Sequence, residues 1–457
     1  MNNTITVQTL IALIESADFK TISNLVRNMP ETDMAELALA LSTEQGLAML
    51  AMLSAPLRAR LFSNLQFAQQ DALLAQMQLA ETVELFTYLP SDDRTDLYKR
   101  MASDQRANLL AALARKQRED IVKMSSYQEG TVGSVATSDY VSVSGNVTVA
   151  EALDSVRQQA PNKETIYTLY VVDGSHRLQG TVSLRDLVLA DQHQTLEALM
   201  KKDVITAKAE WPREEAAKLI SRYDLLSVPV INGGEKLVGI VTVDDAMDVV
   251  DQETTEDFHK MGATFDFGKG HGATGDFSLK SATTTLLYRK RVFWLVLLVF
   301  GNIFSGAGIA YFEETIEAYI ALVFFLPLLV DSGGNAGSQS ATLMVRALAT
   351  GDVVIRDWAK MLGREFMVAV MLGLTMALAV STIGIFRGGY EIAMVVSLSM
   401  ILIVIMGSLI GMSLPFVLSR MKLDPAAASA PLVTSIADAA GVLIYFSIAV
   451  TILGTPV

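Results

Sequence analysis

The chain of 457 residues contains no cysteine and only four histidines, and these absences remove several kinds of chemistry. Without thiols there are no disulfides, no thiolate zinc sites and no cysteine nucleophile. The histidines all precede the apolar last third of the chain, where a soft-metal site is therefore not expected; they are His176, His193, His259 and His271. No basic segment followed by an apolar one opens the chain, and we expect no cleavable signal peptide.

Charged residues are also scarce. They make up 19% of the chain against 51% hydrophobic residues, a composition too apolar for an ordinary soluble enzyme. The net charge of -13 argues against nucleic acid as a partner and favours cations. We find no nucleophile and base arrangement, phosphate-binding loop or metal-ligating pair of histidines, so an enzyme is not predicted.

The apolar residues gather in residues 289–457. Five segments there contain at least about 18 mostly apolar residues, the length that a helix needs to cross a bilayer: 292–312, 319–344, 366–386, 392–418 and 430–453. The second and fourth are longer than needed and contain Gly and Pro, which favours a tilt or a break. We predict an all-α membrane domain of five helices.

Lysine and arginine predict the orientation of this domain. Cations precede the first segment and fill the connections after the second and fourth. Of the opposite loops, the first holds three glutamates and no cation, and the second holds a single cation, Arg387. Cytoplasmic loops carry the excess of Lys and Arg. We therefore expect a multi-pass protein of the cytoplasmic (inner) membrane, with its N-terminus in the cytoplasm and its C-terminus outside.

Residues 1–127 contain a short repeat. A large apolar residue recurs with a period of 12, at Met29, Leu41, Leu53, Leu65, Met77, Leu89 and Met101. A period of this length allows one short helix and one turn per unit, and capping residues such as Ser42 lie beside the recurring apolar residues. The repeat predicts an all-α stack of helices, with a plain helical bundle as the alternative.

Residues 128–251 contain β-branched runs separated by helices, and they repeat at a spacing of 59. The matching pairs are Asp173 with Asn232, Gly180 with Gly239, Ser183 with Thr242, and Asp186 with Asp245. Each half is typical of a hairpin, a short turn and a helix. The pattern resembles a tandem pair of CBS domains, at 128–189 and 190–251, an α/β module that often regulates an attached enzyme or channel.

Each domain of the CBS pair contains a residue spacing that could bind a nucleotide. Ser183 with Asp186 and Thr242 with Asp245 match the Ser or Thr and Asp that hold a ribose in CBS domains, and they could bind an adenine nucleotide. A carboxylate accepts from vicinal hydroxyls while a helix N-terminus faces phosphate. The alternative is a helix N-cap, because a capping box has similar residues at the same spacing.

An acidic stretch follows the pair and leads into residues 252–288, which we interpret as a connecting helix and linker. Its carboxylates are Asp244, Asp245, Asp248, Asp251, Glu253, Glu256 and Asp257, with no Lys or Arg before Lys260. Like charges this close repel, and hard divalent cations that keep their waters suit such clusters. Asp92, Asp93 and Asp96 could face the helix and share regulatory cations with it. The alternative is a solvated acidic helix.

Asp438 is the only charged residue in the fifth segment, 430–453. A charge at the bilayer centre costs roughly 2.5–3.5 kcal/mol on insertion scales, so an intramembrane carboxylate indicates a functional site. The alternatives are an ion pair with a neighbouring Arg and a protonated acid in a helix contact.

The second segment contains a polar interruption between Pro327 and Ser340. Gly333 and Gly334 permit close helix approach or exposed carbonyls, and Asn335 and Gln339 add oxygen ligands. Small residues equally suit helix packing. Polar groups at membrane depth nevertheless have to be buried in protein or line an aqueous cavity, and we predict that this segment lines a pore.

The order of helical domain, CBS pair, acidic helix and five apolar segments resembles the MgtE family of magnesium transporters over essentially the whole chain. The segment from Pro327 to Asn335 and the run from Pro431 to Asp438 carry the resemblance. It implies a homodimer with a central pore, in which Asp438 of each subunit recognises Mg²⁺, Thr434 offers its backbone carbonyl, and Asn335 lies in the wall. It also implies that the acidic residues bind regulatory Mg²⁺ and close the pore when intracellular Mg²⁺ is high. The glycine-rich residues 262–275 depart from the family pattern.

Other functions stay open at this point. Mn²⁺ or Co²⁺ could pass the same carboxylates, and a CBS-regulated membrane sensor without transport would share the cytoplasmic domains. An anion channel would need cations or helix N-termini in its pore in place of Asp438.

Overall fold

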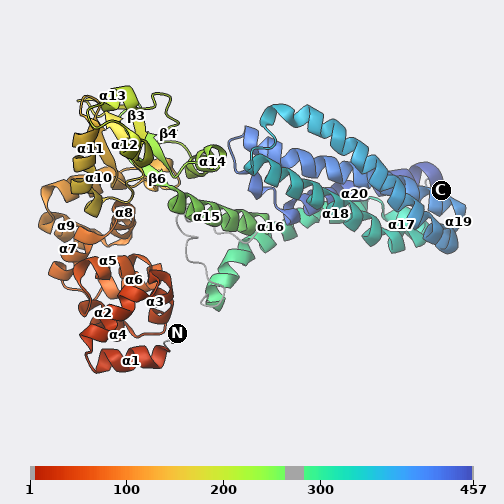
Figure 1. The fold of residues 1–457 in the computed structure, drawn as a ribbon. Helices are drawn as coiled ribbons and strands as arrows, with labels where there is room; N and C mark the ends of the chain where they lie inside the picture. Colours follow the sequence, from red (N-terminus) through yellow and green to blue (C-terminus); the bar gives the residue numbers. More distant parts are fainter. Residues whose placement is uncertain (1–5, 263–282, 455–457) are drawn as a thin grey trace. The chain divides into compact units, whose positions relative to one another are not determined.

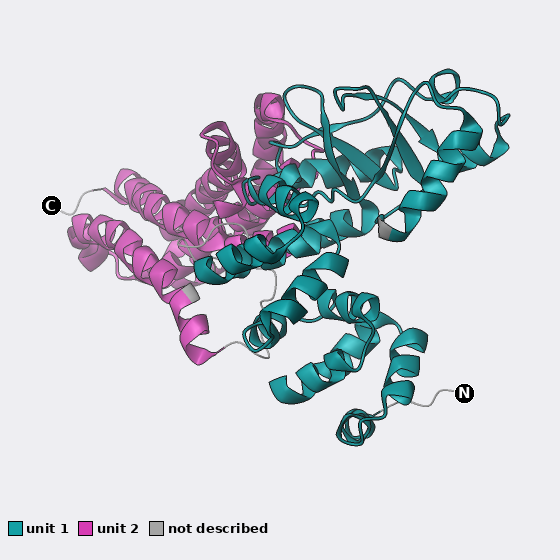
Figure 2. Cartoon of the chain, turned by 90° about the vertical axis from the view of Figure 1, so that its left-hand side faces the viewer, with its two compact units in different colours: residues 1–252, 270–276 teal, residues 253–269, 277–457 magenta. Residues whose placement is uncertain are grey.

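The structure is a computed structural model that describes residues 6–262 and 283–454, and it divides into two compact units. Among the described residues, unit 1 ends at Gln252 and unit 2 begins at Glu253 (Figure 2). Most of the predicted glycine-rich segment 262–275 lies outside the described residues.

Unit 1 begins with ten short helices (Figure 1). They are α1 (Val7–Glu15), α2 (Phe19–Asn28), α3 (Glu31–Ala38), α4 (Thr43–Ala51), α5 (Ala55–Ser63), α6 (Phe67–Leu74), α7 (Leu79–Tyr88), α8 (Ser91–Arg100), α9 (Ser103–Ala112) and α10 (Arg115–Ser125). The first residues of successive helices recur with a period of 12, which confirms the predicted repeat. Leu53, Leu65 and Leu89 follow the ends of helices and are buried.

The packing of these helices favours a stack over a plain bundle. Helices two apart in sequence contact each other: α3 with α5, α5 with α7, α7 with α9, α4 with α6, and α8 with α10. One apolar core runs through the whole series from Leu10 to Ile121. Since a single helix and its turn cannot bury their own apolar face, each helix depends on its neighbours along the stack.

The CBS pair forms two sheets of the same topology. In the first, β1 (Val141–Ser144) pairs in parallel with β2 (Thr168–Val172), which pairs antiparallel with β3 (Leu178–Ser183). The second has β4 (Ala207–Lys208), β5 (Ser227–Ile231) and β6 (Leu237–Thr242) in the same arrangement. The helices are α11 (Val149–Gln159), α12 (Leu184–Leu189), α13 (Leu196–Leu199) and α14 (Arg213–Tyr223), with 3₁₀ turns η1 (Val132–Ser134) and η2 (Ala160–Asn162). Both hairpins repeat at a spacing of 59, including the irregularity after Val171 and Val230, as the sequence predicts.

The acidic helix is continuous with the second CBS domain. The long helix α15 (Val243–Met261) follows β6 directly, as α12 follows β3, and is therefore the extended counterpart of α12. The predicted border between the CBS pair and the connecting helix, at residues 251 and 252, falls inside this helix. Its first part, up to Gln252, belongs to unit 1, and the remainder belongs to unit 2.

Unit 2 is helical. It contains α16 (Thr284–Tyr311), α17 (Glu313–Ala318), α18 (Ala321–Ala349), α19 (Trp358–Arg420) and α20 (Ala430–Leu453), with 3₁₀ turns η3 (Ile355–Asp357) and η4 (Pro425–Ala427). By length and composition, three of the described helices could cross a membrane: Thr284–Tyr311, Ile355–Arg420 and Ala430–Leu453. The second of these is two helices that meet at Gly389, where φ is 80°, and its halves match the predicted segments 366–386 and 392–418.

The predicted second segment corresponds to α18, which stays helical through Pro327 and the glycines after it. Of the predicted alternatives, a tilt or a break, the break is therefore absent from this helix. Its polar residues from Asp331 to Ser340 lower its mean hydropathy, which explains why it is not among the three helices that length and composition select.

Glycines set the distance between α18 and the second half of α19. A Cβ placed on Gly407 would lie 2.2 Å from the carbonyl oxygen of Gly333, and one on Gly411 would lie 1.9 Å from that of Gly337. No side chain can be accommodated at such separations without moving a helix. In this single chain the packing alternative therefore accounts for Gly333, which is buried against α19.

We expect Gly411→Ala to destabilise unit 2 by roughly 1–3 kcal/mol, because the added methyl group collides with backbone on α18. Gly363→Ala, also in α19, is the matched control. A Cβ there meets nothing within 4 Å, so this variant should be neutral or slightly more stable, since Ala favours a helix over Gly by about 1 kcal/mol. Thermal unfolding of the two purified proteins in detergent measures the difference. Equal melting temperatures would contradict the close contact.

Candidate functional site

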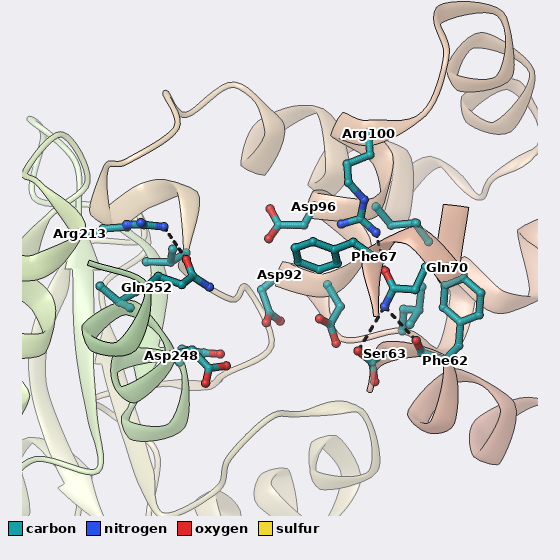
Figure 3. A pocket seen from close by; sticks show the side chains of 16 residues that line it. Phe62, Ser63, Phe67, Gln70, Asp92, Asp96, Arg100, Arg213, Asp248 and Gln252 are labelled. Carbon is teal, nitrogen blue, oxygen red and sulfur yellow. Dashed lines mark hydrogen bonds between the residues drawn. The ribbon is translucent and has the colours of Figure 1, made fainter. Parts of the chain in front are cut away.

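An acidic cavity of about 230 Å³ lies in unit 1, between α8 and the first turns of α15 (Figure 3). Its walls include five carboxylates, on Asp92, Asp93, Asp96, Asp245 and Asp248, and two cations, on Arg100 and Arg213. Figure 3 shows Asp92 and Asp96 on one side and Asp248 on the other. The structure thus brings the three predicted acids of the helical domain together with two of the acidic helix.

Charge and burial act together on these carboxylates. Burial, with Asp93, Asp245 and Glu164 nearby, raises the pKa of Asp92 well above its usual range. Burial and the charge of Asp96 raise the pKa of Asp93 to about 7, and burial raises the pKa of Asp245 to about 6. One carboxylate oxygen of Asp92, Oδ1, is enclosed and has no hydrogen-bond partner in the described structure. The site therefore disfavours the ionised form of its own acids, and a bound cation would offset that effect.

The remaining acids of α15 do not join this cavity. Asp244 and Asp251 are exposed to solvent, and Glu253, Glu256 and Asp257 belong to the part of the helix in unit 2. Across the residues that the structure describes, no three His, Asp or Glu side chains stand close enough to hold a metal ion together. A cation in the cavity would therefore contact the acids through its own waters, as Mg²⁺ commonly does.

Glu256 has a cation supplied by the chain itself. The ammonium of Lys260, one turn later, lies 2.7 Å from Glu256 and also bonds Asp424, the residue before η4. Lys260 is only 8% exposed; burial opposes its charge, but the two carboxylates outweigh burial and raise the pKa of the ammonium above its usual range. Met261 packs beside it against Val345 and Ala426. The end of α15 is thereby fixed to the loop before α20.

The residues predicted to hold a ribose make local contacts. The Ser183 hydroxyl accepts from the Asp186 backbone N–H at 3.0 Å and caps α12, as the N-cap alternative predicts. In the second domain the buried Thr242 hydroxyl donates to the Asp245 carboxylate. Asp245 also lines the acidic cavity, so it contributes to two candidate sites at once.

Asp438 is half-buried on α20, and its Oδ1 is enclosed without a hydrogen-bond partner among the described residues. One turn earlier, the Thr434 hydroxyl lies 3.2 Å from that of Ser338 on α18. The side chain of Thr434 thus joins the two helices. No Arg or Lys forms an ion pair with Asp438 in the described structure, so the salt-bridge alternative finds no support there.

The predicted pore residues on α18 fall on two faces. Gly333 and Gly334 are buried against α19 and α20, where a Cβ on Gly334 would lie 2.8 Å from the Thr434 side chain. Pro327, Asn335 and Gln339 lie on the exposed face of the same helix. Only the second face is free in this chain to line an aqueous path.

Sequence reasoning missed Asp331, which lies on that exposed face and accepts a hydrogen bond of 2.9 Å from the Asn335 amide. It is a charged residue one helical turn before Asn335 in an apolar segment, the same signal that identified Asp438. It also missed Glu164, whose pKa burial raises to about 7, with Asp245 and Asp244 adding to the effect. No sequence pattern marks Glu164.

The described parts match known families in order along the chain. Residues 29–130 match the MgtE intracellular N domain, 132–193 and 196–252 match CBS domains, and 326–448 match the family described as a divalent cation transporter, MgtE.

Related proteins support the same family assignment. The chain is 40% identical to the magnesium transporter MgtE of Thermus thermophilus over 330 residues, 72% of each chain. It is 36% identical to that of Bacillus subtilis over 327 residues, 71% of this chain and 70% of the relative.

Two solved structures resemble about half of this chain. One is the soluble part of a magnesium transporter, with a TM-score of 0.51 and 28% identity, covering 54% of this chain and 97% of that one. The other is the cytosolic domain of the Mg²⁺ channel MgtE in complex with ATP, with a TM-score of 0.50 and 30% identity, covering 53% and 99%. By its sequence and by the order of its domains, this chain belongs to the MgtE family of divalent cation transporters.

Proposed function

We propose that this protein carries Mg²⁺ across the cytoplasmic membrane through a pore formed by two copies of unit 2. The observation that carries the proposal is the Asp438 carboxylate in the apolar helix α20, which has an oxygen without a hydrogen-bond partner among the described residues. Such a charge is costly at membrane depth unless it meets water or a cation. The relatives from Thermus and Bacillus, both named magnesium transporters, support Mg²⁺ as the ion.

Ligand chemistry supports the same ion. Mg²⁺ prefers oxygen ligands and loses its waters reluctantly, so widely spaced carboxylate and amide oxygens can hold it in hydrated form. Asp438 and Gln339 are oxygen-bearing side chains of this kind, Thr434 would add its carbonyl, and Asn335 would lie in the wall of the path. Mn²⁺ and Co²⁺ have similar ligand preferences, and competition experiments would establish how far they share the path.

Regulation by intracellular Mg²⁺ follows from the acidic cavity, with the N-terminal unit in the cytoplasm. Five carboxylates converge there, and burial and mutual repulsion oppose their ionisation. Bound Mg²⁺ would hold α8 and α15 together when its concentration is high, and its loss would let them separate. Because α15 continues into unit 2, this separation can reach the membrane helices.

An adenine nucleotide is a candidate second ligand. The ATP complex of the related cytosolic domain supports it, and so do the pairs Ser183 with Asp186 and Thr242 with Asp245. In this structure Asp245 bonds Thr242 and also lines the acidic cavity. Nucleotide and Mg²⁺ would therefore influence each other through the same carboxylate.

We expect Asp438→Asn to abolish Mg²⁺ uptake while the protein still folds, because the ion loses the charge that offsets its dehydration. Uptake into proteoliposomes with a fluorescent Mg²⁺ indicator measures this. Glu391→Gln, which removes an exposed carboxylate from α19, is the matched control and should transport normally. Normal flux in the Asp438 variant would refute the pore assignment, and no flux in the unmodified protein would favour a sensor without transport.

Millimolar Mg²⁺ should protect unit 1 of the full-length protein from protease. Asp92→Asn and Asp248→Asn should each shift the protection to higher Mg²⁺, because both line the cavity. Glu256→Gln is the discriminating control. Its carboxylate is paired with Lys260, so the Mg²⁺ concentration for half-protection should stay unchanged. An equal shift in all three variants would indicate a general charge effect in place of a site.

The cavity also predicts a pH dependence. A carboxyl whose pKa is about 7 in the folded protein and 3.8 unperturbed makes the folded state less stable as pH rises between these values, and the loss is complete above about 7. In a chelator, thermal stability should therefore fall from pH 5.5 to pH 8, and Mg²⁺ should raise the melting temperature more at pH 8. Asp93→Asn should flatten both trends. The same Mg²⁺ effect at both pH values would contradict the assignment of these acids.

A further inference from the structure

Helices α18 and α20 run antiparallel, and their contacts define which residues lie at the same depth. The Ser338 hydroxyl lies 3.4 Å from the Ala430 carbonyl oxygen, and Gly334 lies against Thr434. Farther along, Val330 approaches Gly441, and the Tyr445 hydroxyl donates to the Leu322 carbonyl at 2.9 Å. On α18, Asp331 lies between Val330 and Gly334. On α20, Asp438 lies between their contact residues, Thr434 and Gly441. The two carboxylates therefore lie at one level.

Asp331 also begins a polar stripe. Asp331, Asn335 and Gln339 follow one another at successive turns, so they share one face of α18, and all three are exposed in the single chain. Polar groups at membrane depth are stable only against protein or water. An exposed stripe that begins at the level of the half-buried Asp438 therefore marks the side of α18 that faces an aqueous path.

The hydrogen bond from Asn335 gives this residue a specific role. Its amide donates to Asp331 Oδ2, which fixes the orientation of the carboxylate and, among the described residues, leaves the other oxygen, Oδ1, available. No hydrogen bond joins Asp331 to Asp438 in the described structure, and Asp438 Oδ1 has no partner there. Two carboxylates at one level of the membrane suit a hydrated divalent cation between them.

We propose that Asp331 is a second carboxylate of the ion path, placed opposite Asp438 and held in position by Asn335. This inference rests on the proposed transport function and adds a specificity residue to it. Asp331 attracts the hydrated cation through its water shell, while Asn335 acts through Asp331. A hydrated ion then meets two carboxylates from each chain at one level of the membrane.

The first test measures Mg²⁺ flux and its inhibition by hexaamminecobalt(III), an ion whose ligands do not exchange and which mimics hydrated Mg²⁺. Asp331→Asn should weaken the apparent affinity for both ions by about tenfold, which corresponds to about 1.4 kcal/mol. Glu391→Gln, the control for the loss of one exposed carboxylate in unit 2, should leave both unchanged. Unaltered affinities for Mg²⁺ and the cobalt complex in Asp331→Asn would overturn the inference.

The second test separates the role of Asn335 from general packing. Asn335→Leu alone should weaken inhibition by the cobalt complex, but in the Asp331→Asn background it should add nothing, because residues that act through one group are not additive. Additive losses would overturn the positioning role. Asn335→Leu keeps the Asp331 carboxylate, so it also tests the pair should the Asp331 variant fail to fold.

The outcomes also separate this inference from the function on which it rests. Normal flux in Asp438→Asn, or none in the unmodified protein, removes the proposed pore and this inference with it. A blocked Asp438 variant together with an unaffected Asp331 variant leaves the pore in place and removes only the role of Asp331.

Discussion

The membrane unit depends on helix contacts so close that only glycine fits at them. Gly407 and Gly411 of α19 approach the backbone of α18, and Gly334 of α18 lies against Thr434 of α20. These contacts fix the rotation of α18 about its axis. They bury its glycine face in protein and turn Asp331, Asn335 and Gln339 outward. The packing that stabilises the unit thus also decides which polar groups are left for an ion path.

The clustered carboxylates at the two ends of α15 have different surroundings. In unit 2 the chain supplies its own cation, since the Lys260 ammonium lies between Glu256 and Asp424. In unit 1 five carboxylates share a cavity with two arginines, and burial, with the neighbouring acids adding to it, raises the pKa values of Asp93 and Asp245. In the first arrangement the carboxylates are already paired with a cation of the chain. Under the regulation proposed above, the second would respond to the concentration of a cation, which is what a sensor requires.

Periodic features of the fold could be predicted from the sequence, because each repeats a local physical requirement. The period of 12 marks the start of every helix in the first domain, and the spacing of 59 marks both hairpins. Contacts between distant residues could not be predicted in this way. The bond from Lys260 to Asp424 joins residues 164 positions apart, and nothing in the local pattern assigns Glu256 to that lysine and away from the acidic cavity. Glu164 likewise joins the acidic residues only through the fold.

Asp331 is a candidate pore residue that sequence reasoning did not identify. A single charge in an apolar segment identified Asp438, whereas the pore prediction for the second segment rested on its glycines and amides and did not use Asp331. Its position opposite Asp438 follows only from the antiparallel contacts of α18 and α20.

The pair has a consequence for how a transporter of this kind balances its affinity. Ion conduction needs binding strong enough to admit the ion and weak enough to release it. One carboxylate per chain attracts a divalent cation, and a second at the same level strengthens that attraction. The amide of Asn335 donates to the Asp331 carboxylate and fixes its orientation. Attraction through the water shell, instead of direct ligation, would then keep Mg²⁺ hydrated and its release fast.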